Sequence, residues 1–152
     1  MGQTGDIFIA VAQSPEEREA CYAIRKTVFI EGQKVPKERE RDGLDDEAVH
    51  FLALYEGKPV GTLRVRFKDD ATAKIERLAV LEAMRGKRIG EALMRFAEAD
   101  PAISQKQKII LQSQSYIVPF YERLGYKASG EEFLDVGIPH RLMTKEARTK
   151  AA

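Results

Sequence analysis

This sequence of 152 residues has a single cysteine, a net charge close to zero and no long apolar run. Cys21 is the one cysteine, so no disulfide can form within the chain, which suits a reducing compartment. The formal net charge of +1 gives no general electrostatic reason to bind nucleic acid or an anionic membrane. No apolar run reaches the roughly 20 residues of a membrane helix, and residues 1–10 lack the pattern of a secretory signal. We therefore expect a cytoplasmic protein with no nucleic-acid or membrane partner.

What the sequence does contain is enough apolar residues for a core, since 43% are hydrophobic and 32% are charged. No repeat or linker-like stretch divides the chain, so residues 1–152 are expected to form a single domain. Hydrophobic spacing and turn residues predict an α/β protein in which helices cover a mixed sheet. The expected strands are 6–12, 50–55, 60–67, 74–80, 108–111, 127–134 and 138–144. The expected helices are 14–30, opened by a capping box of Ser14 and Glu17; one from about 86, with Ile89, Leu93 and Phe96 on its buried side; and 117–124, ended by Gly125 in a left-handed conformation. A charged loop is expected at 31–46.

The most informative stretch joins the expected strand at 74–80 to the helix after it. It reads Arg85-Gly86-Lys87-Arg88-Ile89-Gly90. The first amides of a helix lack intrahelical acceptors and carry the positive end of the helix dipole, and glycine lets a ligand approach the backbone. The pattern therefore predicts a diphosphate site, with an ordinary solvated helix start as the alternative. Neither the P-loop pattern nor the Gly-x-Gly-x-x-Gly dinucleotide fingerprint is present.

These residues resemble the cofactor signature of the GNAT superfamily of N-acetyltransferases, Arg/Gln-x-x-Gly-x-Gly/Ala, with Arg88 where the family usually has glycine. Residues 120–126, Phe-Tyr-Glu-Arg-Leu-Gly-Tyr, resemble the family's second hallmark. Residues 27–31, 45–46, 50–51 and 137–140 resemble a bacterial subgroup of ElaA- and YjcF-like proteins. The match runs from about Ile7 to Met143. It implies a single N-acetyltransferase domain whose mixed, mostly antiparallel sheet has splayed central strands and flanking helices.

The resemblance also implies acetyl-CoA as cosubstrate and a small-molecule or peptide amine as acceptor, with direct transfer in a ternary complex. The pantetheine arm would pair with the main chain of Leu78 and Val80. The diphosphate would meet the amides of the signature, namely Arg85, Gly86, Lys87, Arg88, Ile89 and Gly90. A homodimer is common in this family. The alternative function is a non-catalytic acyl-CoA-binding sensor or interaction module with the same fold.

Acetyl transfer requires a neutral amine, and an amine of the lysine type has a pKa near ~10.4, so a base is needed at neutral pH. Glu76 is our first candidate, with an ion pair to Arg64 or Arg66 as the structural alternative. His140 is the second, since a histidine side chain ordinarily titrates near ~6.5. Tyr121 is the candidate acid for the departing thiolate, with a packed tyrosine whose hydroxyl is satisfied locally as the alternative.

The remaining polar residues carry weaker predictions. Gln112 lies at the end of a strand, where it could bond the cofactor amide or simply be solvated. His50 could act as a base but is more simply structural, and Cys21 is most simply a core residue. No cluster has metal-ligand spacing, so we expect no metal. Six acids of the loop could attract a cationic amine or be solvated; they are Glu31, Glu38, Glu40, Asp42, Asp45 and Asp46.

Overall fold

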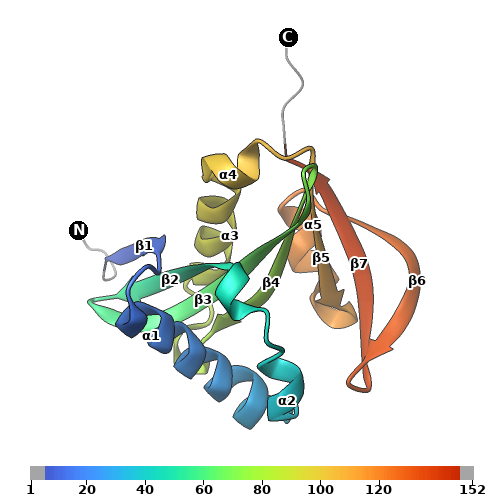
Figure 1. The fold of residues 1–152 in the computed structure, drawn as a ribbon. Coiled ribbons are helices and arrows are strands. Elements are labelled where there is room, and N and C mark those ends of the chain that lie inside the picture. Colours follow the sequence, from blue (N-terminus) through green and yellow to red (C-terminus); the bar gives the residue numbers. More distant parts are fainter. Residues whose placement is uncertain (1–5, 148–152) are drawn as a thin grey trace. The chain divides into compact units, whose positions relative to one another are not determined.

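Seven strands are found in the computed structural model, which describes residues 6–147, and they follow the order β1-β2-β3-β4-β5-β7-β6 (Figure 1). The pairings β1–β2, β2–β3, β5–β7 and β6–β7 are antiparallel, and β4 pairs with β5 in parallel. The parallel register covers only Thr72–Lys74 with Lys108–Ile110, although both strands continue beyond it. The expected mixed, mostly antiparallel sheet is confirmed.

The order of helices and strands agrees closely with the predicted order. The strands are β1 Ile7–Val11, β2 Val49–Tyr55, β3 Lys58–Asp69, β4 Thr72–Val80, β5 Lys108–Gln114, β6 Lys127–Asp135 and β7 Ile138–Glu146. The α-helices are α1 Pro15–Arg25, α2 Lys37–Glu40, α3 Ile89–Ala99, α4 Pro101–Ser104 and α5 Val118–Arg123. Short 3₁₀ turns lie at Asp45–Glu47, Glu82–Met84 and Ser115–Ile117.

The described residues form two compact units, 6–65 with 77–97, and 66–76 with 98–147. In the first unit, α1 begins with the predicted capping box, in which the Ser14 hydroxyl and the Glu17 carboxylate each bind a backbone amide of the first turn. Its apolar face packs on one side of the strands through a buried cluster that includes Cys21, Ile24 and Leu52. Cys21 is therefore a core residue, as expected.

The other side of the strands in this unit is covered by α3. Ile89 and Leu93 lie 3.2 and 3.0 Å from where a Cβ on Gly61 would stand, so only glycine lets α3 pack this closely on β3. Phe96, expected in the buried stripe of this helix, is instead 41% exposed, and Met94 and Ala97 are buried with Ile89 and Leu93. The stripe is therefore rotated from the predicted one.

The second unit contains α4 and α5, and α5 contacts β5 and β6. The Lys145 ammonium group donates to the Leu124 carbonyl at 2.7 Å and pairs with Glu98 at 3.0 Å, while the Tyr126 hydroxyl donates to Glu98 at 2.7 Å. Gly125 ends α5 with φ +99°, the left-handed cap that its position predicted. Within residues 6–147, no helix is long and apolar enough to cross a membrane.

Three departures from the predicted elements have local causes. The helix expected over 14–30 changes at Lys26 into a π-helical segment, Lys26–Gly32. The short helix α4 was not predicted; Asp100 caps it by accepting from the Ala102 amide at 2.9 Å. Helix α3 starts at Ile89, three residues later than expected, because Arg88 adopts a left-handed conformation with φ +63°.

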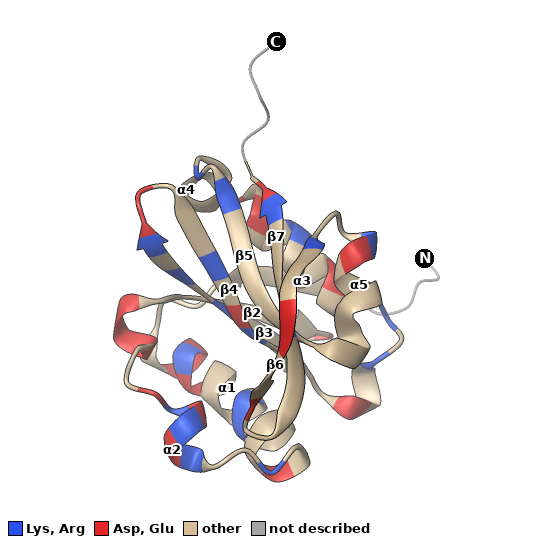
Figure 2. Cartoon of the chain, turned by 90° about the vertical axis from the view of Figure 1, so that its right-hand side faces the viewer, with Lys and Arg blue, Asp and Glu red and all other residues tan. Residues whose placement is uncertain are grey.

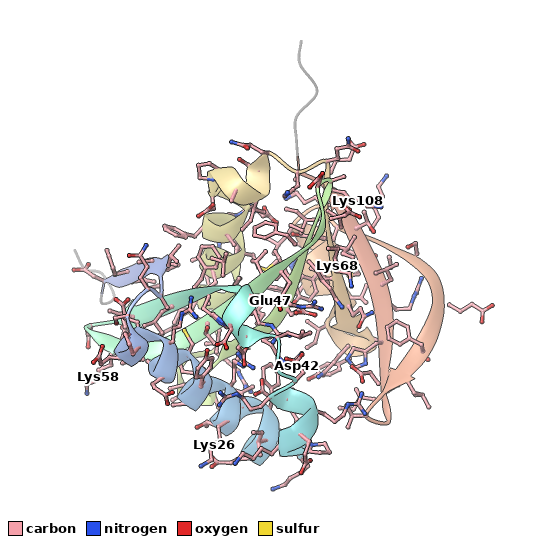
Figure 3. All side chains as sticks on the ribbon, in the orientation of Figure 1. Lys26, Asp42, Glu47, Lys58, Lys68 and Lys108 are labelled. Atoms are coloured by element: carbon pink, nitrogen blue, oxygen red, sulfur yellow. The ribbon has the colours of Figure 1, made fainter. Side chains whose placement is uncertain are left out.

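Three of the six acids of the charged loop are held by arginines and are not open to a ligand. Figure 2 shows both charge signs on α2, and Figure 3 labels Asp42 just beyond that helix. In the first unit, three arginines from α1, β3 and β4 hold three loop acids in an ion-pair network, which comprises Arg25, Arg64 and Arg77 with Glu40, Asp42 and Asp45. The expectation that these acids attract a cationic amine is therefore wrong for Glu40, Asp42 and Asp45.

Candidate active site

The predicted diphosphate site lies where β4 leads into α3, in the first unit. Gly86 has φ +85° with open space around the position of a Cβ, and Arg88 has φ +63°. The first helical hydrogen bond runs from the Ala92 amide to the Arg88 carbonyl at 3.0 Å. The amides that precede Ala92 therefore have no acceptor within the helix, which is the arrangement that binds an anion.

Basic side chains surround these amides. Arg85, Lys87 and Arg88 are all exposed. The Arg85 Nε donates to the Val80 carbonyl at 3.2 Å, so this side chain is drawn toward the end of β4. The Lys87 Nζ lies 5.5 Å from the centre of the Tyr55 ring. Positive charge is therefore concentrated beside the unpaired amides. Leu78 and Val80, which precede this turn on β4, are half-buried.

The conformation of Arg88 gives a stability prediction. A non-glycine residue in the left-handed region costs on the order of 1 kcal/mol, and glycine removes this cost. Arg88→Gly should therefore raise the free energy of unfolding by about 0.5–1 kcal/mol in urea titrations. Lys87→Gly is the matched control, because Lys87 is equally exposed but is not among the residues of positive φ. A destabilised Arg88→Gly protein would show that the side chain contributes more than the strain costs.

Tyr121 lies on α5 in the second unit and is half-buried. Its ring makes edge-to-face contacts with Phe120 and Tyr126, at centroid distances of 4.9 and 6.1 Å. Among the described residues its hydroxyl has no hydrogen-bond partner, whereas the Tyr126 hydroxyl is bound by Glu98. Burial raises the pKa of Tyr121. The alternative of a locally satisfied tyrosine is therefore not what is observed, and the phenol stays protonated.

His140 lies on β7 in the same unit, with 8% of its surface exposed. Its Nδ1 is 2.7 Å from the Ile138 carbonyl, and its ring stacks on Phe133 at a centroid distance of 5.8 Å and an interplanar angle of 27°. Because a carbonyl only accepts hydrogen bonds, Nδ1 carries the proton of the neutral ring and Nε2 carries the lone pair. The ring is thus fixed with a basic nitrogen that has no partner among the described residues.

Glu76 is held as its structural alternative predicted. Arg66 binds both carboxylate oxygens, at 2.8 and 3.0 Å, and the Lys74 ammonium group lies 3.2 Å from one of them. The carboxylate is 10% exposed. Both oxygens are occupied by cationic donors, so neither is free to take a proton from an amine. Arg77, the next residue of β4, has φ +60°, which interrupts the alternation of side chains between Glu76 and Leu78 as a bulge does.

Tyr121 and His140 belong to opposite faces of the β5–β7 pair. Met143 and Lys145 lie on the face that carries α5, since Lys145 binds the Leu124 carbonyl. Alternation along β7 puts His140 and Leu142 on the other face. Gln112 is paired with Leu142 and shares that face, where it is exposed. The candidate acid and the candidate base would therefore approach a ligand from two sides.

Two further predictions concern histidine and metal sites. His50 is buried in the first unit, where its Nε2 contacts the Asp45 carbonyl at 2.9 Å and its ring meets Tyr22 edge to face. It is therefore a structural residue, as the simpler interpretation held. Within residues 6–147, no group of three or more His, Cys, Asp or Glu side chains is placed to hold a metal ion.

Comparison with known proteins decides the family. Residues 12–147 match the family model of the acetyltransferase (GNAT) domain. The chain belongs to the GNAT family of acetyltransferases. The GNAT protein is 39% identical over 138 residues to the "Uncharacterized N-acetyltransferase YjcF" of Bacillus subtilis, covering 90% of this chain and 97% of that relative. The resemblance to YjcF- and ElaA-like proteins is thus confirmed, and the GNAT protein is an acyltransferase.

Solved structures agree with this assignment. The crystal structure of Escherichia coli ElaA matches with a TM-score of 0.78 and 25% identity, covering 94% of the GNAT protein and 100% of that chain. An aminoglycoside 6′-N-acetyltransferase complexed with coenzyme A matches with a TM-score of 0.76 over 95% and 99% of the two chains. Its identity is 16%, so this second likeness concerns the fold alone.

Proposed function

We propose that the GNAT protein transfers the acetyl group of acetyl-CoA to a primary amine, directly and within a ternary complex. Both compact units would serve one N-acetyltransferase domain, since the family match runs through both. The observation that carries the proposal is the start of α3, where amides without helical acceptors lie beside Arg85, Lys87 and Arg88. A diphosphate is the group of acetyl-CoA that such a site suits.

Different groups of the cofactor site would bind different parts of acetyl-CoA. The amides from Gly86 to Gly90 would bind the diphosphate, with the three basic side chains adding charge. The Arg85 amide already donates to the Glu82 carbonyl at 3.2 Å, so Arg85 would contribute its side chain alone. The main chain of Leu78 and Val80 would pair with the pantetheine arm, after the Arg85 side chain releases the Val80 carbonyl. Gln112, exposed on β5, would bond a cofactor amide or the acceptor.

Gly90→Val should weaken CoA binding by at least tenfold, or about 1.4 kcal/mol. Gly90 is the second residue of α3, and a branched side chain there would hold a diphosphate away from the amides. Isothermal titration calorimetry with CoA measures the effect. Thermal unfolding of the same sample checks that the fold is intact. A folded Gly90→Val protein that binds CoA like wild type would remove the diphosphate site from this turn.

The chemistry needs a proton acceptor for the amine and a donor for the thiolate. We assign the acceptor to the Nε2 of His140, since both oxygens of Glu76 are bound by Arg66 and Lys74. The neutral amine attacks the thioester carbonyl, and the resulting oxyanion collapses to break the C–S bond. Tyr121 donates a hydrogen bond and then its proton to the sulfur. Because the thiolate forms in the same apolar surroundings, its own proton affinity is raised too.

The pH dependence of kcat/KM separates the two candidate bases. The rate should rise with pH as the base loses its proton. His140→Ala should remove or displace this acidic limb, whereas Glu76→Gln should leave it in place. A limb lost in Glu76→Gln and kept in His140→Ala would return the base to Glu76. If the limb persists in both variants, it reports the ionisation of the acceptor amine and no protein base is involved.

A further inference from the structure

Arg77 occupies a strained position in the strand that leads to the cofactor turn. It lies within β4 and has φ +60°, a value that side chains other than glycine rarely adopt. A left-handed residue inside a strand interrupts the alternation of side chains and bends the strand, as a bulge does. The next residues, Leu78 to Val80, complete β4 and lead toward the start of α3.

The Arg77 side chain explains how this conformation is held. Its Nη2 donates to the Arg39 carbonyl at 3.1 Å and to the Glu40 carbonyl at 3.2 Å. The same nitrogen lies 3.2 Å from the Asp42 carboxylate, and Nε lies 3.2 Å from Glu40 Oε2. The guanidinium group therefore binds main-chain and side-chain oxygens of one short segment, residues 39–42.

That segment is itself anchored at its other end. Arg25, fully buried on α1, binds the Glu40 carboxylate at 2.7 Å and that of Asp45 at 2.8 Å. Arg64, fully buried on β3, binds both oxygens of Asp42 at 2.9 Å. Buried, fork-shaped contacts of this kind fix geometry more strictly than a surface ion pair does. The oxygens that hold Arg77 are therefore rigidly placed.

We propose that Arg77 is a positioning residue for acetyl-CoA, acting through the bend that it maintains in β4. The tether to residues 39–42 keeps Arg77 left-handed, and this sets the direction of Leu78 to Val80, whose main chain would pair with pantetheine. Arg77 itself touches no reacting atom. The inference rests on the proposed function and adds a dependence of cofactor binding on a loop that lies outside the signature.

Two measurements test this role, namely the dissociation constant for CoA and amide hydrogen exchange at Leu78 to Val80. Arg77→Ala should raise the dissociation constant at least tenfold and speed exchange at these amides. Arg77→Gly should behave alike, because glycine permits the backbone conformation but lacks the tether. Arg77→Lys should fall between, since a single ammonium group cannot replace the planar fork. Arg41→Ala is the control: Arg41 pairs with Asp45 at 3.4 Å and lies over the Tyr22 ring at 4.2 Å, and neither partner belongs to β4.

Asp42→Asn tests the tether from the loop side if the Arg77 variants do not fold. It leaves β4 unchanged and should raise the dissociation constant several-fold. Wild-type affinity in folded Arg77→Ala or Asp42→Asn protein would overturn the inference. A loss of affinity equal to that of Arg41→Ala would also overturn it, as a general effect of the network. Failure of wild type to bind CoA would instead overturn the proposed function, and the exchange data would still report whether Arg77 shapes β4.

Discussion

Tyr121→Phe should lower kcat by roughly ten- to a thousand-fold while the dissociation constant for CoA stays nearly constant. The substitution removes only a hydroxyl that has no partner among residues 6–147, so no hydrogen bond of the fold is lost. The edge-to-face contacts of the ring with Phe120 and Tyr126 are kept. The effect should therefore fall on the step in which the thiolate leaves, and steady-state kinetics beside CoA titration measures it.

Tyr126→Phe is the matched control for that experiment. It removes the hydroxyl that donates to Glu98 at 2.7 Å, in the same unit of the fold. The expected result is the opposite one, a small loss of stability with kcat near the wild-type value. If Tyr121→Phe keeps wild-type kcat, Tyr121 is a packing residue. If both variants lose kcat together, the effect comes from loosening of α5.

Arg25→Met should destabilise the protein by about 3–5 kcal/mol, the largest stability effect that we expect. Arg25 is fully buried, and it binds Glu40 and Asp45 through short, charge-assisted hydrogen bonds. Removing it leaves two carboxylates with a lost partner inside the first unit. Urea unfolding measures the difference. Arg95→Met is the control, because its pair with Glu91 is exposed and should contribute no more than about 1 kcal/mol.

The same network sets the response to acid. Burial alone would raise the pKa values of Asp42 and Asp45, but hydrogen bonds from Arg64 hold the pKa of Asp42 well below its usual range, and hydrogen bonds from Arg25 and Arg64 lower the pKa of Asp45. Their contribution to stability is therefore present above ~3.9 and is lost as the pH falls below it. Burial lowers the pKa of His50, so stability should already begin to decline below ~6.5. In Arg25→Met the loss of stability at the lower of these two pH values should become smaller. If the loss of stability at this lower pH is the same in Arg25→Met as in wild type, Arg25 does not lower the pKa of Asp45.

Local patterns predicted the fold because they are set by nearby residues. The capping box at Ser14 and Glu17 and the left-handed cap at Gly125 both follow from a few neighbouring positions. The cofactor turn was found for the same reason, since glycine and basic residues gather within six positions. Its late helix start was missed because an arginine in the left-handed region has no sequence signal.

The ion-pair network could not be predicted, because it joins residues that lie far apart in the sequence. Arg25 and Asp45 are separated by 20 positions, and Arg77 and Asp42 by 35. Nothing in the neighbouring sequence distinguishes the buried Asp45 from a solvated aspartate. The one available signal was the number of arginines on the expected strands, since a charged side chain that a strand buries needs an ion-pair partner. The pairing of Glu76 with Arg66 was weighed because the two strands are adjacent.

The proposed function requires that the GNAT protein turns over acetyl-CoA and does not merely bind it. The most direct measurement is CoA thiol release from acetyl-CoA with a panel of primary amines, with the acetylated amine identified by mass spectrometry. We predict release that depends on one class of amine and produces its N-acetyl derivative, and that falls in Tyr121→Phe. If calorimetry shows CoA binding but no amine of a wide panel causes thiol release, the result would contradict the enzymatic function and favour the acyl-CoA-binding module.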